Sequence, residues 1–421
     1  MYKKNKIFIL VVFIFYFLAI LTPPIFADES NELLDDNSTI KEEIVETIET
    51  SSKETSLPDI NSRSAVVIDR NTNTILFGKQ ENEKRKMAST TKIMTCLIVL
   101  ENSNLSETVE ISKKSAGTGG SRLGLKTGDK ITVNDLLYGL MLCSGNDTAV
   151  ALAEHVGGSI EGFANIMNNR AKELGLENTH FITPHGLDAD DHYTTAFELA
   201  KLANIALKND TFRKIVGTKT YTVTINGNPK QITNTNELLG NLNGVYGVKT
   251  GFTNGANRCL VTACKRNNMD IICVVLGADT KKFRTKDSIK LIEYSFKTFT
   301  PVDVQGLVND KFEQWKKDNL NCFEIIKGQT QNVDLKITPL EFGTIPINNN
   351  SIKDINIHIN CSQILNAPII EGTALGKIDV YTGENLLTSC DILLNCNIQK
   401  KTVFNYFIEI IKGLKTSFSS F

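Results

Sequence analysis

The chain has 421 residues, 41% hydrophobic and 22% charged, which is typical of globular proteins and long enough for two or three domains. Its 46 basic and 47 acidic side chains leave a net charge of −1. No overall positive field therefore favours a polyanion, and we expect no nucleic-acid partner.

The N-terminus, residues 1–27, has the pattern of a secretory signal peptide. Lys3, Lys4 and Lys6 precede an unbroken apolar run, residues 7–21, and Ala27 is a small residue suited to cleavage. The run is shorter than the roughly 18–20 residues that span a bilayer as a helix, which favours cleavage over an uncleaved anchor. Either alternative predicts that the rest of the chain is exported.

Residues 28–60 are polar, acidic and without an aromatic side chain. Such a composition buries little apolar surface, so it predicts a disordered acidic linker with at most a transient helix over residues 40–48. The chain also contains nine scattered cysteines, an odd number, most of them within apolar strings and with no CxxC pair. These features favour buried free thiols over a disulfide framework or a cysteine metal site.

Residues 61–298 read as one α+β domain. A strand–turn–strand pattern opens it over residues 65–77, and amphipathic helical runs follow between residues 89 and 208. Strand patterns then return around the turns Asn226-Gly227 and Asn267-Asn268, and a helix over residues 285–296 closes the region. Sequential hairpins pair antiparallel, so we expect one antiparallel sheet built from both ends of the segment, flanked by helices and carrying a helical insert.

Two further segments complete the chain. Residues 302–397 alternate short apolar stretches with Pro, Gly and Asn turns, which predicts a small all-β domain. In residues 400–421, apolar side chains recur every three or four positions among lysines, which is typical of an amphipathic helix. We expect this helix to lie in the membrane interface, at the outer face of the cytoplasmic membrane, with docking onto the β domain as the alternative.

The triplet Lys-Thr-Gly occurs twice. The copy at Lys126 leads into Thr132 and Asp135, a capping pattern at a helix start, so its lysine is expected to be a solvated surface charge. The copy at Lys249 leads into a predicted strand. We expect this second copy to lie at the edge of the sheet. An edge strand is able to bind an extended peptide, and Lys249 would then face the cleft in which the peptide lies.

Ser89 and Lys92 stand three residues apart at the start of the first long helix, and therefore share one face. A serine hydroxyl needs a base to become a nucleophile, and a neutral lysine one turn away is able to serve. Burial and a second cation, Lys249, both lower a lysine pKa. The plain alternative is a helix cap and a surface lysine. Ser144 and Asn146 lie in a polar break between two helices, where they suit a proton relay and the orientation of a substrate amide, or simply a capped loop.

The order Ser-x-x-Lys, Ser-x-Asn, Lys-Thr-Gly is the set associated with penicillin-binding proteins and serine β-lactamases, and only the second triplet obeys it. The longer matches are ASTTKIMT (88–95), SGND (144–147), TPHGL (183–187) and GVKTGFT (247–253). Through them, residues 64–298 resemble the serine-type D-alanyl-D-alanine carboxypeptidases, the low-molecular-mass penicillin-binding proteins of the peptidase S11 type. The predicted signal peptide, β domain and terminal helix agree with that layout.

This resemblance implies a mechanism without a metal or cofactor. Ser89 would attack the bond between the terminal D-alanines of a peptidoglycan stem peptide, Lys92 would accept its proton, and Ser144 would help protonate the leaving D-alanine. Lys249 and Thr250 would hold the terminal carboxylate, with Gly251 and Asn146 completing the substrate-binding set. The Ser89 N–H and one N–H from the strand after Lys249 would form the oxyanion hole. β-Lactams would acylate Ser89 as inhibitors.

The chain departs from the family pattern by Met87 in place of a common proline and Asn73 where glycine is frequent. Neither change touches the reacting groups. The alternatives left open are a D,D-endopeptidase or β-lactamase on the same site, and a non-catalytic penicillin-binding or cell-wall-binding protein. We assign no residue as a dedicated base for fast β-lactam deacylation, so fast β-lactamase action is the less expected alternative.

Two sets of polar residues lie outside the motifs. The spacing of His180, His185 and His192 does not match a helical zinc pair, so we expect them to structure a loop rich in turns. We expect Arg284 either to add charge near the carboxylate pocket or to form a surface salt bridge.

Overall fold

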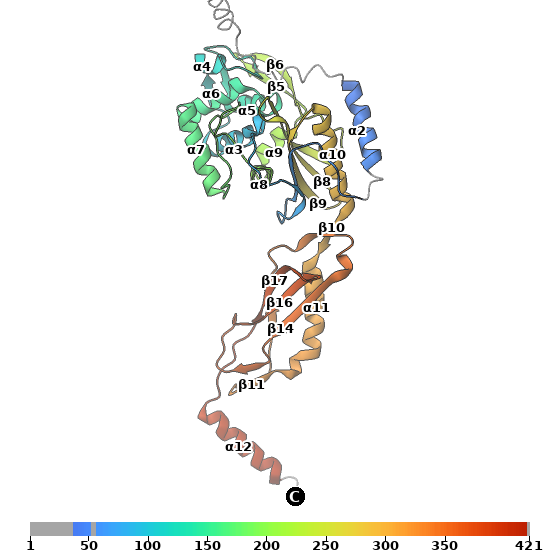
Figure 1. Cartoon of the computed structure of the whole chain (residues 1–421). Helices are drawn as coiled ribbons and strands as arrows, with labels where there is room; N and C mark the ends of the chain where they lie inside the picture. The colour runs from blue at the N-terminus through green and yellow to red at the C-terminus, as the bar shows by residue number, and fades with distance from the viewer. Residues whose placement is uncertain (1–36, 52–55, 419–421) are drawn as a thin grey trace, which may run out of the picture. The chain divides into compact units, whose positions relative to one another are not determined.

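The computed structural model describes residues 37–51 and 56–418 of the chain. The predicted signal peptide lies outside these residues. The chain divides after Phe296 into two compact units, which are drawn in Figure 1 and described separately below.

The first unit is built on a five-stranded antiparallel sheet with the order β2-β1-β9-β8-β7. Its strands are β1 (Ser64–Asp69), β2 (Ile75–Lys79), β7 (Val245–Thr253), β8 (Asn257–Arg266) and β9 (Met269–Ala278). The first strand of the segment thus pairs with its last, β1 with β9. The prediction of one sheet from both ends of the segment, with helices inserted between, is confirmed.

The inserted helices are α3 (Lys92–Asn102), α4 (Lys113–Ala116), α5 (Val133–Leu142), α6 (Asn146–Gly157), α7 (Ile160–Glu173), α8 (Ala196–Ala206) and α9 (Asp210–Val216). Two short antiparallel pairs lie among them, β3 (Thr108–Glu110) with β4 (Lys130–Thr132) and β5 (Thr220–Ile225) with β6 (Asn228–Thr233). Helix α3 is buried over residues 92–99, on all of its faces, so it is a central helix and not a surface one.

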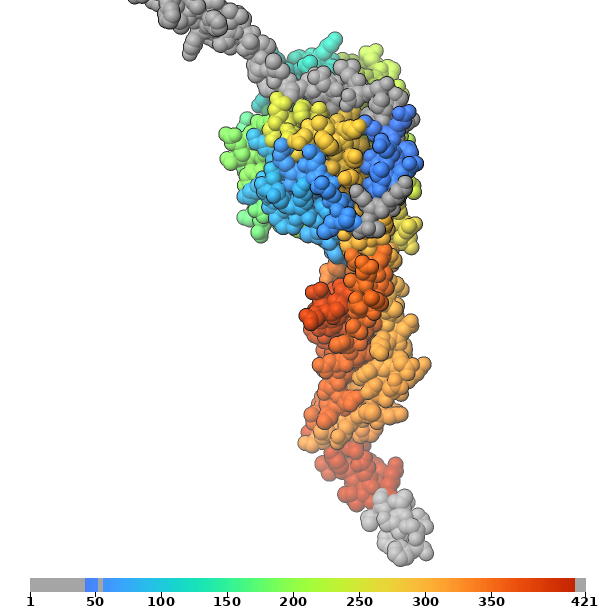
Figure 2. Space-filling model, turned by 45° about the vertical axis from the view of Figure 1, so that its right-hand side comes forward, coloured from blue at the N-terminus to red at the C-terminus, as the bar shows by residue number. Residues whose placement is uncertain are grey.

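The acidic segment differs from the expectation of disorder. Residues 37–51 form helix α2 (Asn37–Ser51), which lies beside α10 (Lys281–Thr298) (Figure 1, Figure 2). Ile44 is buried, and Glu43 pairs with Lys282 at 2.5 Å. One of the acidic side chains that indicated disorder thus pairs with a lysine more than two hundred residues away, a contact that no local pattern reveals.

The second unit contains a four-stranded antiparallel sheet with the order β12-β17-β16-β14. The strands are β12 (Leu335–Ile337), β14 (Ile355–Cys361), β16 (Ala374–Thr382) and β17 (Asn385–Leu394). Smaller pairs join β10 (Phe299–Asp303) to β13 (Thr344–Asn348) and β11 (Glu324–Ile326) to β15 (Ile364–Asn366). The predicted β domain is present, with one addition.

That addition is helix α11 (Val304–Asn319), in a segment where strands alone were expected. Val304, Val308 and Phe312 recur every four residues and are its buried positions, so the helical stripe was present in the sequence. Two short 3-10 turns, Leu320–Cys322 and Ile352–Asp354, are the remaining regular elements before the terminal helix.

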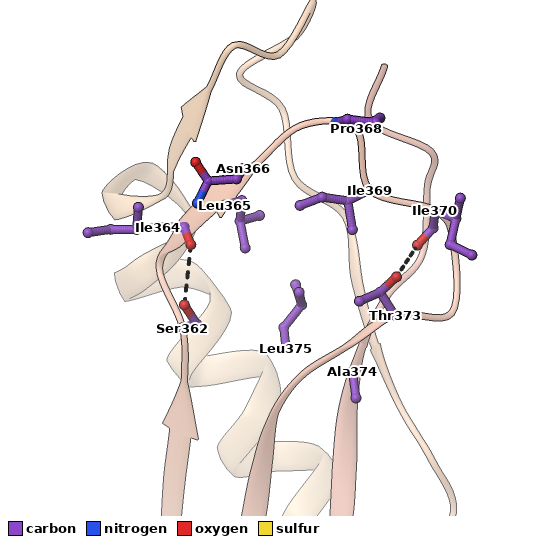
Figure 3. Close-up of a pocket in the computed structure, with 10 residues that line it drawn as sticks. All are labelled: Ser362, Ile364, Leu365, Asn366, Pro368, Ile369, Ile370, Thr373, Ala374 and Leu375. Carbon is purple, nitrogen blue, oxygen red and sulfur yellow. Dashed lines mark hydrogen bonds between the residues drawn. The ribbon is translucent and has the colours of Figure 1, made fainter. Parts of the chain in front are cut away.

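A surface hollow of about 470 Å³ in the second unit is lined mainly by apolar side chains, among them Ile364, Ile369 and Ile370 (Figure 3). It contains none of the predicted catalytic residues. The last element is α12 (Val403–Phe418), in which Val403, Phe404 and Phe407 are exposed. None of the helices in residues 37–51 and 56–418 combines the length and apolar character needed to cross a bilayer.

Candidate active site

Ser89 lies in a 3-10 turn, Ala88–Thr91, that continues directly into α3 at Lys92. Lys92 is 0% and Ser89 5% exposed, and the Lys92 Nζ lies 2.7 Å from the Ser89 Oγ. The alternative of a capping serine and a surface lysine is therefore wrong, because the α3 N-terminus has no side-chain cap and the lysine has no access to solvent.

The Lys92 amine has two further close neighbours. Its Nζ lies 2.7 Å from the Asn146 Oδ1 and 2.9 Å from the backbone carbonyl oxygen of His185. Both of these oxygens only accept hydrogen bonds, whereas the Ser89 hydroxyl is also able to donate. An ammonium with three N–H donors satisfies all three oxygens. A neutral amine with two N–H donors satisfies the two obligate acceptors and leaves a lone pair for the serine proton.

Ser144 stands between α5 and α6 in a left-handed backbone conformation, with φ of 59°. Its side chain is buried, and its Oγ has no hydrogen-bond partner among the described residues. A buried, unpaired hydroxyl on a strained backbone is typical of a functional site. Asn146 begins α6, and its Nδ2 donates to the carbonyl of Gly119 at 2.8 Å.

The second Lys-Thr-Gly triplet lies within β7, an edge strand of the five-stranded sheet. Lys249 and Thr250 are both 1% exposed, and the Thr250 hydroxyl lies 2.7 Å from that of Thr235. Gly251 brings this strand against the nucleophile turn, since a Cβ on Gly251 would lie 3.1 Å from the Ser89 backbone nitrogen. The three motifs therefore converge, although they are far apart in the sequence.

The first triplet is elsewhere. Lys126, Thr127 and Gly128 are exposed in the turn before β4, as expected for a surface copy. Thr132 caps α5 by accepting a hydrogen bond from the Asp135 N–H at 3.1 Å, which confirms the predicted helix start.

Sequence reasoning missed Asp147, a buried carboxylate that fastens a loop beside the site. It accepts hydrogen bonds from the backbone N–H groups of Leu123, Gly124 and Leu125 at 2.9, 2.8 and 3.0 Å. The only sequence signal was an acidic residue directly after Asn146 at a helix start, which also suits a simple cap.

The loop over residues 183–188 was also underestimated. Its Pro184 carbonyl accepts from the Thr95 hydroxyl at 2.6 Å, next to the His185 carbonyl that contacts Lys92. Farther along, the Asp188 carboxylate accepts from the Thr253 hydroxyl at 2.8 Å and from the Gly255 N–H at 2.9 Å. The loop therefore ties α3 to the end of β7.

Two of the three histidines of this region are buried. Burial, then the charge of Lys92 and of His192, lowers the pKa of His185 to about 3. Burial, then the charge of His180, lowers the pKa of His192 to about 4, so both rings are neutral near neutral pH. Within the described part of the chain, no cluster of three or more histidine, cysteine or acidic side chains is arranged to hold a metal ion.

Arg284 lies in the interior and not at the surface. It is fully buried, and its Nη2 lies 2.6 Å from the Oε1 of Glu237, which is itself largely buried. Burial would raise the pKa of Glu237, but the charge of Arg284 and hydrogen bonds from Thr285 and Arg284 outweigh it and keep the pKa below its usual value. The interpretation as a surface salt bridge is therefore wrong.

All nine cysteines are free thiols, and five of them are buried. Burial raises the pKa of Cys143, which directly precedes Ser144, to about 11, with the charge of Asp147 adding to the effect. This thiol therefore stays protonated near neutral pH and is a poor nucleophile.

Comparisons with known proteins agree with this geometry. A family model described as peptidase S11, D-alanyl-D-alanine carboxypeptidase, matches residues 51–280, and one described as penicillin-binding protein 5, C-terminal domain, matches residues 316–400. The D-alanyl-D-alanine carboxypeptidase DacF of Bacillus subtilis (strain 168) is 33% identical over 85% of this chain and 90% of its own length. DacC of Escherichia coli (strain K12), another such carboxypeptidase, is 32% identical over 82% of this chain and 86% of its own length.

Solved structures are similar too. Penicillin binding protein 5 from Haemophilus influenzae matches with a TM-score of 0.67 and 26% identity, over 82% of this chain and all of that one. The Streptomyces K15 DD-transpeptidase matches with a TM-score of 0.56 and 38% identity, over 58% of this chain and all of that one.

Proposed function

Because the chain belongs to the peptidase S11 family of serine-type D-alanyl-D-alanine carboxypeptidases, we propose that Ser89 is its nucleophile and Lys92 the base that activates it. The observation that carries this assignment is the 2.7 Å approach of the Lys92 Nζ to the Ser89 Oγ in a site closed to solvent.

In the first half-reaction, the Ser89 Oγ attacks the carbonyl between the two terminal D-alanines of a stem peptide, and its proton passes to the Lys92 Nζ. The negative charge that develops on the carbonyl oxygen is met by the Ser89 N–H and by an N–H of β7. The close approach of Gly251 to the Ser89 nitrogen supports this pairing, because it brings the two backbone segments together.

Collapse of the tetrahedral intermediate breaks the amide bond and expels D-alanine. The leaving amine takes, through Ser144, the proton that Lys92 had accepted, so that Lys92 is neutral again. The unpaired, buried Ser144 Oγ supports this role, since it is free to bond a group that enters the site. Water then attacks the acyl-enzyme ester, and the proton it loses passes to Lys92. Lys92 returns this proton to the Ser89 oxygen as the ester bond breaks.

Substrate orientation is assigned to the remaining motif residues. Lys249 and Thr250 hold the terminal carboxylate, with Gly251 leaving room beside the nucleophile. Asn146 orients a substrate amide while its Oδ1 fixes the Lys92 amine. β7 ends the sheet, so its free edge is suited to an extended peptide that adds as a further strand.

A fluorescent penicillin tests this assignment. The wild-type chain should form a covalent adduct, and mass spectrometry of its peptides should place the penicilloyl group on Ser89. Ser89→Ala should abolish labelling, and slow loss of label together with D-alanine release from a pentapeptide separates a carboxypeptidase from a β-lactamase, in which label is lost fast. Labelling of another serine would overturn the assignment.

We further propose that the chain is exported and that α12 holds it at the outer face of the membrane. The exposed Val403, Phe404 and Phe407 and the lysines around them support this placement. In co-sedimentation with anionic lipid vesicles, Phe404→Asp with Phe407→Asp should abolish binding. Leu386→Asp is a matched control, because Leu386 is an exposed apolar residue outside α12 and its replacement should leave binding intact.

A further inference from the structure

The backbone immediately before Ser89 is held in an unfavourable conformation. Ala88 has φ of 47°, in the left-handed region, where the Cβ of a non-glycine residue crowds the backbone. A conformation of this kind persists only when its surroundings impose it. The position of Ser89 therefore depends on whatever holds Ala88.

One contact on Ala88 comes from its own turn. The Thr91 hydroxyl donates to the Ala88 carbonyl oxygen at 2.8 Å. Thr91 is fully buried, so water does not replace this hydrogen bond. The Thr91 oxygen also accepts hydrogen bonds, and in a buried position a protein group has to donate to it. That donor comes from a distant part of the chain.

It is His192, whose Nε2 lies 2.8 Å from the Thr91 Oγ1. The other ring nitrogen, Nδ1, accepts from the backbone N–H of Ile182 at 2.9 Å. A neutral imidazole carries one proton, and because Nδ1 accepts, that proton is on Nε2. The hydrogen bonds therefore run in one direction, from His192 to Thr91 and from Thr91 to the carbonyl of Ala88.

The segment around His192 contacts the same turn a second time. Gly186 packs so closely that a Cβ there would lie 2.0 Å from the Ala88 carbonyl oxygen. The adjacent His185 carbonyl contacts the Lys92 amine at 2.9 Å. One loop thus fixes the backbone before the nucleophile and the amine of its base.

We propose that His192 is a positioning residue for acylation, which acts through Thr91 to hold the Ala88 carbonyl and so keep Ser89 in its attacking geometry. His192 itself contacts no substrate. The inference rests on the proposed role of Ser89 as the nucleophile.

The arrangement requires the neutral ring. A second proton would go to Nδ1, where it would face the Ile182 N–H and break that bond. The charged or titratable groups that influence the ring are His180 and His185, Lys86 and Asp188. Of these only Asp188 favours the protonated ring, and burial outweighs it, so the network is intact near neutral pH and is lost only in acid.

The test uses the full chain and two pairs of variants. His192→Gln retains an acceptor for Ile182 and a donor for Thr91, whereas His192→Leu removes both. Thr91→Ser retains the hydroxyl, whereas Thr91→Val removes it. For each, the rate constant of Ser89 acylation by a fluorescent penicillin and kcat and KM on a D-Ala-D-Ala peptide are measured across a pH series that extends into acid.

We expect the acylation rate and kcat of His192→Gln and Thr91→Ser to stay within about threefold of wild type. His192→Leu and Thr91→Val should lose about tenfold or more in both quantities with little change in KM, as expected when positioning is lost. The wild-type acylation rate should also fall in acid by a step that His192→Gln lacks. Asn168→Ala is the structural control, since Asn168 bonds the backbone of Phe181 beside the same loop but takes no part in the relay.

Full acylation rates in both His192→Leu and Thr91→Val would overturn the inference. Rates in His192→Gln and Thr91→Ser as low as those of the disruptive variants would overturn it too. So would an equal loss in Asn168→Ala, because the effect would then follow loop stability alone. If His192→Leu does not fold, Thr91→Val decides the matter. Labelling that survives in Ser89→Ala would instead show that the assigned nucleophile, and not this inference alone, is wrong.

Discussion

Gly251 lies so close to Ser89 that a single added carbon would stand 3.1 Å from the Ser89 backbone nitrogen. The same carbon would lie 3.2 Å from the Met87 carbonyl oxygen, so it has little space on either side. The Ser89 N–H is the expected oxyanion donor, and β7 must approach it without a side chain at this position.

Gly251→Val should therefore slow acylation by about 10²–10³-fold, the range seen when one oxyanion donor is lost, and Gly251→Ala should show a smaller loss. The measurement is the second-order rate constant for penicillin labelling, corrected for the folded fraction. Gly343→Ala is the control, because its Cβ would meet only an ordinary contact at 3.6 Å. Unchanged labelling in Gly251→Val would contradict the proposed oxyanion site.

The two Lys-Thr-Gly triplets offer an internal comparison. Lys249 is buried at the site and Lys126 is exposed in the turn before β4. Lys249→Ala should raise KM for a D-Ala-D-Ala peptide and slow penicillin labelling by about tenfold or more, because a charge-assisted bond to the carboxylate is lost. Lys126→Ala should leave both unchanged, and the reverse pattern would show that the wrong triplet was chosen.

The buried ion pair of Arg284 and Glu237 should govern stability. Arg284→Met leaves the Glu237 carboxylate buried without its cation, and we expect a loss of about 3–5 kcal/mol in the free energy of unfolding. Adding Glu237→Gln to this variant should recover part of the loss, because the stranded charge is removed. Urea denaturation of the three proteins measures both effects, and a double variant less stable than Arg284→Met would contradict this account.

The pKa of His192, lowered from 6.5 to about 4, gives a pH dependence of stability. Between these values the unfolded chain binds a proton that the folded chain does not, so stability falls as pH decreases and is fully regained above about 6.5. The shift corresponds to about 3 kcal/mol. His192→Gln removes this titration, so in denaturation series the free energy of unfolding of the wild type should decline more steeply in acid than that of the variant.

Equal slopes in the two proteins would show that His192 titrates normally. Carboxylates contribute to acid unfolding in both proteins, and for this reason the comparison uses the difference between the two curves and not either curve alone.

Local patterns predicted much of the fold. The turns at Asn226-Gly227 and Asn267-Asn268, the cap at Thr132 and the amphipathic helices depend on neighbours within a few residues, so they are visible in the sequence. The stripe of Val304, Val308 and Phe312 was equally local and was overlooked. Helix α2 was not predictable in this way, because its partner is the distant helix α10.

The sequence by itself determined which residue types the site contains and their order along the chain, because motif order and periodicity are properties of the chain alone. Only the tertiary structure decided that Lys92 is buried against three oxygens, that Gly251 meets Ser89, and that Arg284 is paired in the interior. Burial and distance depend on which surfaces pack together, and packing between segments a hundred residues apart leaves no local trace in the sequence.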